Sequence, residues 1–254
     1  MGGRGRLVTI LLLAALGVSL FASLGVWQVE RRAWKLDLIA QVDARLGAEP
    51  VAAPGPDAWA AINRADDQYR RVTVTGNFRP EDVLVQAVTE EGPGFWVLSP
   101  LVSEAGDTLL VNRGFVPQGM RDAAARRAPE GAVTVTGLLR MSEPKGGFLR
   151  ANDPAAGRFY SRDVPVIAET LGLGPVAPYF VDAESGAAIG AYPVPGLTVV
   201  NFRNSHLIYA LTWFGLALMV VGGAVIAVRH ERRRDDPAAA AVPRAPVRGI
   251  PHPG

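Results

Sequence analysis

The sequence contains no cysteine and only three histidines among its 254 residues. Without cysteine the chain forms no disulfide, and a thiolate metal site or a cysteine nucleophile is excluded. The HExxH, P-loop, GxSxG and GxGxxG motifs, which mark common catalytic or nucleotide sites, are absent as well. A hydrolase triad needs a base oriented by a third group, and residues 27–204 hold no histidine. These absences argue against an enzyme.

A strong positive charge is missing from the middle of the chain. Residues 27–204 hold 18 Lys and Arg against 21 Asp and Glu, a net charge of −3, whereas the two ends hold 8 against 3, a net charge of +5. The basic character therefore lies at the termini. The middle of the chain carries no basic stripe of the kind that binds nucleic acid, so we expect no nucleic-acid partner.

Two long uncharged runs are typical of transmembrane helices. The first covers residues 7–26, and the second lies within residues 205–228; each is close to the ~20 residues needed to cross a bilayer core. A cleaved signal peptide is the alternative for the first run, but signal h-regions are usually shorter, at roughly 7–15 residues. The second run is too long and too uniformly apolar for a core helix. The sequence therefore predicts a two-span membrane protein.

The arginines around these runs predict its orientation. Arg4 and Arg6 precede the first run, and Arg229 and residues 232–234 follow the second. The positive-inside rule then places residues 1–6 and 229–254 in the cytoplasm, the latter ending in a Pro- and Ala-rich tail that we expect to be disordered. Residues 27–204 are expected to form a periplasmic domain. An apolar run that begins at residue 7 leaves no room for a mitochondrial presequence, so we expect a bacterial plasma (inner) membrane.

The domain between the runs has the pattern of a small antiparallel β fold. Apolar residues at three- and four-residue steps predict that a helix continues over residues 30–46, followed by a linker over 48–56. A short helix is expected at 164–171, closed by Gly172. Strands are predicted at 69–78, 83–88, 95–101, 108–115 and 132–140, with weaker candidates at 158–162 and 179–182. Short strands with few helices favour a barrel or a sandwich. The fold class is therefore a membrane-anchored α+β domain, mainly antiparallel β.

Polar and aromatic side chains gather where the second run begins. Imidazole, phenol and indole groups follow one another on the expected helix, from His206 through Tyr209 to Trp213, and at this spacing we expect them to share one face. Aromatic side chains at this depth commonly anchor a helix at the membrane surface, and a histidine there can cap the helix. A lone imidazole beside apolar and aromatic surface can also be an axial haem ligand. Both interpretations of His206 remain open from the residues alone.

Three cations lie on the side where the positive-inside bias does not place them. They are Arg31, Arg32 and Lys35, just past the first run. Pairing with lipid phosphates explains them simply, and pairing with the propionates of a haem is the alternative. Small residues at four-residue steps in the first run, Ala15, Ser19 and Ser23, are expected to permit close approach of another helix.

Four stretches of the chain resemble conserved motifs of one family. They are LGVWQVERRAWK at 24–35, LLVNRGFVP at 109–117, ANDPAAGRFYSRDVP at 151–165 and NSHLIYALTWFGLA at 204–217. They are similar, in the same order, to the LGxWQxxRxxWK, LVNRGWVP, NDP and NNHLxYAxTWF motifs of the surfeit locus protein 1 family. Phe115 stands in place of the usual Trp, and Ser205 in place of the second Asn. The turn-like NRG is expected to place Gly114 at positive φ, with Arg113 contacting a partner or a propionate as the alternative.

This resemblance implies a biogenesis factor for haem–copper (cytochrome c) oxidase. Such a factor would be a non-catalytic chaperone of the respiratory chain that assists haem a insertion into subunit I, with haem a as a transient cofactor and His206 of the NNHLxYA motif as its iron ligand. Arg31 and Arg32 would face the propionates, and Tyr209 and Trp213 would line the site. The expected partners are subunit I, other assembly factors and membrane lipids. The alternative is a membrane scaffold that stabilises oxidase intermediates and binds no cofactor.

Overall fold

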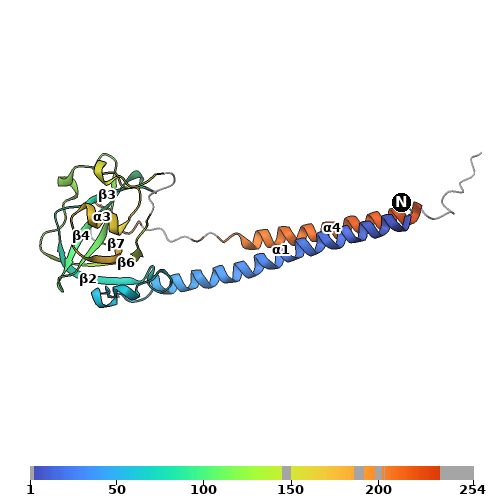
Figure 1. Cartoon of the computed structure of the whole chain (residues 1–254), viewed down its shortest axis with the longest axis horizontal. Helices are drawn as coiled ribbons and strands as arrows, with labels where there is room; N and C mark the ends of the chain where they lie inside the picture. Colours follow the sequence, from blue (N-terminus) through green and yellow to red (C-terminus); the bar gives the residue numbers. More distant parts are fainter. Residues whose placement is uncertain (1–2, 145–149, 186–191, 198–201, 203, 235–254) are drawn as a thin grey trace, which may run out of the picture. The chain divides into compact units, whose positions relative to one another are not determined.

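The computed structural model describes residues 3–144, 150–185, 192–197, 202 and 204–234, and its elements are drawn in Figure 1. The chain divides into a helical unit, formed by residues 1–39 and 202–254, and a second unit formed by residues 40–201. The tail predicted to be disordered, 235–254, lies outside the described residues.

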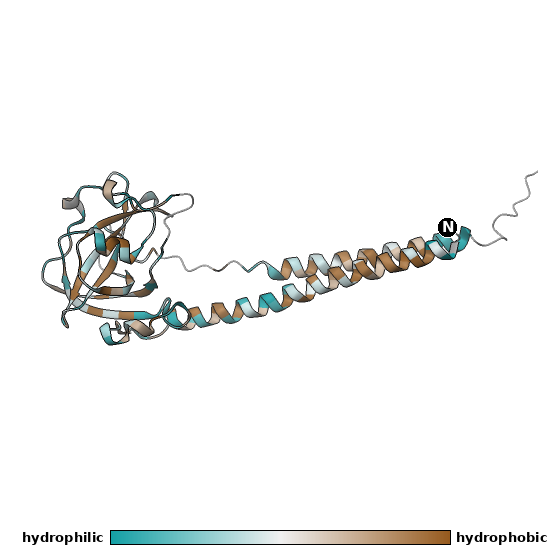
Figure 2. Cartoon of the chain, in the orientation of Figure 1, coloured by the Kyte–Doolittle hydropathy of each residue, from teal (hydrophilic) through white to brown (hydrophobic). Residues whose placement is uncertain are grey.

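Two long helices make up the helical unit. Helix α1 covers Gly3–Leu46 and helix α4 covers His206–Arg234. Both are long and apolar enough to cross a membrane, as the two uncharged runs predicted, and Figure 2 shows their apolar residues along the stretch where the two helices lie together. The helix predicted over 30–46 is the continuation of α1. Its end belongs to the second unit, where Val42 is buried and Arg45 donates hydrogen bonds to the carbonyls of Gln68 and Ala65.

The second unit is a closed, barrel-like sheet of mostly antiparallel strands. The strand order is β1-β2-β6-β7-β5-β4-β3, and an additional pairing of β2 with β4 closes the barrel. The β4–β5 hairpin across residues 104–107 is the one predicted from the sequence. Only β1–β2 and β5–β7 pair in parallel among the described strands. The strands are β1 (Val51–Ala52), β2 (Arg71–Phe78), β3 (Val83–Thr89), β4 (Gly92–Ser103), β5 (Thr108–Pro117), β6 (Ala132–Met141) and β7 (Val176–Ala183).

Two identical VTVTG stretches form one of the central pairings of the barrel. Residues 72–76 in β2 lie antiparallel to residues 133–137 in β6, with Val74 opposite Val135. Each stretch ends in a glycine at a close backbone approach. A Cβ atom on Gly76 would lie 2.2 Å from the Val102 carbonyl oxygen of β4, and one on Gly137 would lie 2.2 Å from the Asp182 carbonyl oxygen of β7. Glycine is therefore required where β2 approaches β4 and where β6 approaches β7.

Strands β5 and β7 are buried on both faces because the sheet has a core on each side. Leu109, Val111 and Val181 point into the barrel, with the apolar residues of β2, β4 and β6. Leu110 and Phe180, which alternate with them, face an outer cluster that contains Phe159 and residues of helix α3 (Val164–Thr170). Helix α3 agrees with the helix predicted at 164–171, and Gly172 follows it at φ +60°. This second layer explains why these strands lack the in–out alternation of β2.

Two local predictions were wrong, and one short helix was not predicted. Residues 158–162 form no strand; they make only isolated bridges, including Phe159 with Val85 of β3. The expected linker over 48–56 contains β1, which pairs with β2, and runs into a 3₁₀ helix (Pro56–Ala61). A further single helical turn, α2, covers Arg64–Asp67, where the Asn63 side chain accepts a hydrogen bond from the Asp66 amide. Short polar turns of this kind lack the periodicity on which the predictions rested.

We expect Gly76→Ala to destabilise the barrel because its Cβ would meet backbone, which cannot rotate away as a side chain can. Overpacking of this kind costs about 1–3 kcal/mol. The control is Gly119→Ala, whose added Cβ has no atom within 4 Å. Thermal unfolding of the full chain in detergent should show a clearly lower Tm for Gly76→Ala and an unchanged one for Gly119→Ala. Equal Tm values for the two variants would contradict the tight β2–β4 closure.

Candidate functional site

The His206 side chain is held by a glutamine of the facing helix. Its Nδ1 lies 2.8 Å from Oε1 of Gln28 in α1. An amide oxygen only accepts hydrogen bonds, so Nδ1 is the donor in this contact and Nε2 is the ring nitrogen that Gln28 does not engage. Within the part of the chain that the structure describes, the imidazole makes no other hydrogen bond. The arrangement fixes the tautomer in which Nε2 can bind a metal.

Close packing of the two helices continues from this contact toward their other end. The Phe21 ring of α1 stacks on Trp213 of α4, with 5.8 Å between centroids and 19° between planes. A Cβ on Gly25 would lie 2.5 Å from the Phe214 ring, and one on Gly17 would lie 3.4 Å from Val220. Glycine thus lets an aromatic ring of α4 lie against the α1 backbone.

The small residues expected to face a neighbouring helix do not contact α4. Ala15, Ser19 and Ser23 are all exposed. The contacting face carries Gly17, Phe21, Gly25 and Gln28 instead. The α4 contact therefore uses a different face of α1, and the approach of another helix to Ala15, Ser19 and Ser23 stays a prediction.

The other predicted residues of the second span separate on the helix. His206 and Trp213 turn toward α1, and Ala210 between them is 2% exposed. Tyr209 is 55% exposed and therefore lies away from this contact. The structure brings together the imidazole and the indole but leaves the phenol on the flank of the helix.

The three unexpected cations lie on the turns of α1 that follow Gln28. Arg32 and Lys35 are four and seven residues beyond Gln28, which places them on the same side of the helix. Lys35 Nζ is 4.9 Å from the centroid of the Phe202 ring, and Arg31 is exposed with its guanidinium 4.0 Å from the centroid of the Trp34 ring. Arg32 and Lys35 therefore extend the row that begins with the imidazole, while Arg31 packs on a neighbouring aromatic ring.

An ion pair joins the two helices at their other end. Arg6 Nε lies 2.8 Å from Oε1 of Glu231, whose side chain is 8% exposed. Sequence reasoning missed both Gln28 and Glu231. The available signal for Glu231 was a single acidic residue inside the basic stretch RHERRR at 229–234. For Gln28 it was a polar residue at the end of an apolar run.

A separate charged network lies in the barrel unit around Asp182 of β7, which is 3% exposed. Its oxygens accept hydrogen bonds from Asn112 at 2.7 Å, Arg140 at 2.9 Å and Arg162 at 3.0 Å. Glu143 accepts from both arginines at 2.8–3.0 Å. Burial lowers the pKa of Arg162, but the two carboxylates more than offset this, so its pKa is raised overall.

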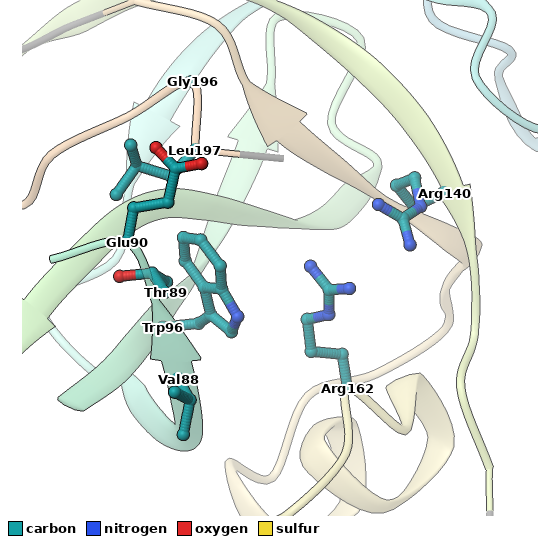
Figure 3. A pocket seen from close by; sticks show the side chains of 8 residues that line it. All are labelled: Val88, Thr89, Glu90, Trp96, Arg140, Arg162, Gly196 and Leu197. Carbon is teal, nitrogen blue, oxygen red and sulfur yellow. The ribbon is translucent and has the colours of Figure 1, made fainter. Parts of the chain in front are cut away.

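This network forms one wall of a cavity of about 380 Å³. Figure 3 shows the Arg140 and Arg162 guanidinium groups turned toward one another, across from Trp96. The strand ends of β3 and the backbone at Gly196 line the rest. Because two carboxylates already balance the two guanidinium groups, the wall carries little net charge. Its arginines act in the barrel as bridges between β6, β7 and the segment before α3.

The NRG motif is structural rather than a surface turn. Gly114 lies inside β5 at φ +134°, and a Cβ there would lie 2.4 Å from the Val194 carbonyl group. Arg113 is 9% exposed, and its guanidinium donates to Ser99 Oγ and to the carbonyls of Arg126 and Arg127. Burial lowers the pKa of Arg113. Positive φ was therefore predicted correctly, but the strand continues through it.

No metal cluster of the usual kind appears among the residues that the structure describes. Nowhere in that part of the chain do three or more His, Cys, Asp or Glu side chains gather as a metal site requires. An iron bound here would depend on the porphyrin for its equatorial ligands and on a protein side chain only for an axial position.

Comparison with known proteins settles the family. The model of the SURF1 family matches residues 15–218. The chain belongs to the surfeit locus protein 1 family. It is 34% identical to surfeit locus protein 1 of Rattus norvegicus over 76% of this chain and 67% of the relative, and 34% identical to that of Homo sapiens over 76% and 69%. A SURF1-like protein of Monosiga brevicollis is 33% identical over 78% and 79%.

Family membership confirms the resemblance drawn from the four motifs and implies a role in cytochrome oxidase assembly. This family consists of assembly factors, not of known enzymes. The matched span includes both Gln28 and His206, so their contact lies within the part of the chain that matches the family model.

Engineered cysteines should report the helix contact without background, since the chain has none of its own. We expect Gly17→Cys with Val220→Cys to form a disulfide under mild oxidation, because the Cβ position at 17 lies 3.4 Å from the Val220 side chain and disulfides need Cβ atoms about 4 Å apart. Ala15→Cys with Val220→Cys is the control, as residue 15 is exposed. For both cysteine pairs, the extent of cross-linking is measured as the fraction of thiols protected from alkylation. Equal cross-linking of the two pairs would contradict the described face.

Proposed function

We propose that this protein is a membrane-anchored assembly factor that holds haem a through His206 while the haem passes to subunit I of cytochrome oxidase. The observation that carries the proposal is the Gln28–His206 hydrogen bond, which leaves Nε2 as a free axial donor. Haem-ligating and metal-ligating histidines commonly donate their other ring N–H to such an acceptor. Haem a is the cargo in this proposal and not a resident catalytic group.

The surroundings of His206 fit an amphiphilic plate with carboxylates at one edge. Apolar and aromatic surface lies on one side of the imidazole, at Trp213 and Phe21, and cations lie on the other, at Arg32 and Lys35. Arginine suits propionates because its planar fork can bond both oxygens. Arg31 and Tyr209, which are exposed beside this row, are placed to extend the site rather than to complete it.

A scaffold without a cofactor is the second candidate, and one observation favours it. The Gln28–His206 bond is by itself a sufficient use for a polar pair between two apolar helices. In that case the imidazole positions α4 on α1, and the exposed face with Ala15, Ser19 and Ser23 contacts oxidase subunits. Haem content separates the two candidates because only the first requires it.

For the location we propose the plasma membrane of a bacterium, with residues 27–204 in the periplasm. Two helices of membrane-spanning length and composition support membrane association. The orientation rests on Arg4, Arg6 and the basic end of α4, which the positive-inside rule assigns to the cytoplasm. Other assembly factors and membrane lipids are the further partners that this placement predicts.

We expect His206→Ala to remove or shift the Soret band of protein purified from cells that make haem a, because the axial nitrogen is lost. Protein abundance should remain nearly unchanged. His230→Ala is the matched control, since His230 lies on the same helix and is exposed. The ligand assignment is wrong if His206→Ala protein keeps its full haem content and an unaltered spectrum.

Gln28→Leu refines this test. Loss of a group that orients a metal-binding histidine typically weakens metal binding by about 10–100-fold. We therefore expect haem binding to be weakened but not abolished. In the scaffold alternative, this variant has no haem to lose.

We expect alkaline phosphatase fused after Ala128 to be active and the same fusion after Arg234 to be inactive. The first fusion point lies in the barrel unit and the second at the end of α4. Alkaline phosphatase folds only where its disulfides form, outside the cytoplasm. The reverse pattern of activity would refute the proposed orientation.

A further inference from the structure

A second cavity of the barrel unit, of about 540 Å³, has a different charge balance from the one in Figure 3. Residues of β3, β4, the loop after β5 and the segment before α3 line it. Its apolar side includes Phe95, 6% exposed, and Phe159, 4% exposed. Its polar side carries three arginines, Arg121, Arg150 and Arg158. We call this feature the arginine cleft.

Two of these arginines have no acidic partner among the residues that the structure describes. The Arg121 guanidinium lies 4.5 Å from the centroid of the Phe95 ring, and that of Arg150 lies 5.4 Å from the centroid of the Tyr160 ring. The only side-chain hydrogen bond given for Arg150 is a long one, 3.3 Å, to Gln86 Oε1. A guanidinium that lies over a ring can still donate its N–H groups at its edge to a carboxylate. Both groups are therefore supported but not neutralised.

The third arginine is paired within the cleft. Arg158 donates to Asp153 at 2.5 Å, and this hydrogen bond lowers the pKa of Asp153. The three arginines and this carboxylate leave a local charge of +2. Residues 27–204 as a whole carry a net charge of −3, so the cleft is positive on a domain that is acidic overall. By contrast, Asp182 and Glu143 balance the two arginines of Figure 3.

Buried side chains hold the loop that carries Arg121 in place. The buried Arg126 guanidinium donates to the Arg121 carbonyl and forms an ion pair with Asp82 at 2.8 Å. Arg113 in turn donates to the Arg126 carbonyl. A site whose cations are fixed in advance loses less entropy when it binds. Buried arginines thus position an exposed one.

From these observations we infer that the arginine cleft docks an acidic segment of a partner protein, with Glu or Asp carboxylates on Arg121 and Arg150 and apolar side chains against Phe95 and Tyr160. This inference rests on the assembly role only in that such a factor must meet a protein partner. A peptide in which acidic and apolar residues alternate matches both the two separate cations and the apolar side of the cleft. A lipid headgroup offers one phosphate and no apolar side chain beside it.

The experiment measures binding of a fluorescent peptide of alternating Glu and Phe to the full chain in detergent, by anisotropy. The same peptide with Gln for Glu is the uncharged control. We expect the Glu peptide to bind, to weaken as salt is raised, and to bind about tenfold or more weakly to Arg121→Gln/Arg150→Gln. The matched control variant is Arg79→Gln, an exposed arginine already paired with Glu81. Arg121→Lys/Arg150→Lys keeps the charge and should retain part of the affinity.

Three results would overturn the inference. They are no binding of the Glu peptide, equal binding of the Gln peptide, and an equal loss with Arg79→Gln. Binding of phosphatidylglycerol vesicles that depends on Arg121 and Arg150, without peptide binding, would assign the cleft to the membrane surface instead. The Glu and Gln peptides decide the matter on the unmodified protein even if a variant fails to fold. Haem content of the same preparations reports separately on the proposed haem site.

Discussion

One hydrogen bond, between the Gln28 amide and the His206 imidazole, sets which nitrogen of the His206 ring faces helix α1. Interhelical hydrogen bonds in membranes contribute on average only about 0.6 kcal/mol, so this contact adds little to stability. The packing of Gly17, Phe21 and Gly25 against α4 must supply most of that. The hydrogen bond instead selects one tautomer and one orientation of the ring. A contact that is weak in energy but specific in geometry is suited to a ligand that must also be released.

The barrel uses buried charge in the opposite way. Asp182 satisfies two guanidinium groups and an amide at once, and removing it would leave two buried cations with only Glu143 between them. Breaking such a network typically costs about 3–5 kcal/mol. These arginines therefore fix the relative positions of strands and are poorly suited to bind a transient partner. The arginine cleft differs because its two unpaired cations sit at the surface of the same fold, on rings that hold them in place.

The sequence alone predicted the elements whose signal is periodic. Alternation placed β2 and β6, the uncharged runs placed α1 and α4, and the motif around His206 singled out the residue that contacts Gln28 of α1. It did not predict Gln28 as the partner of His206, because the two residues lie 178 positions apart. The Asp182 network and the β2–β4 closure at Gly76 also depend on residues that are not neighbours in the sequence, since Asn112 lies 70 positions from Asp182 and Val102 lies well beyond the turn after Gly76. Which face of α1 meets α4 could not be read from the sequence for the same reason, since it is decided by where Phe214 and Val220 come to lie.

The polar contacts at the two ends of the helix pair differ in kind: one is an ion pair and the other is a neutral hydrogen bond. Arg6 and Glu231 form an ion pair at one end, and an ion pair between the helices favours one register of α4 on α1. With the register fixed there, the other end does not need a strong bond and can use a neutral one. A neutral amide oxygen accepts a hydrogen bond from Nδ1 of the imidazole. In the proposed haem site, Nε2 is then the ring nitrogen that would bind the iron.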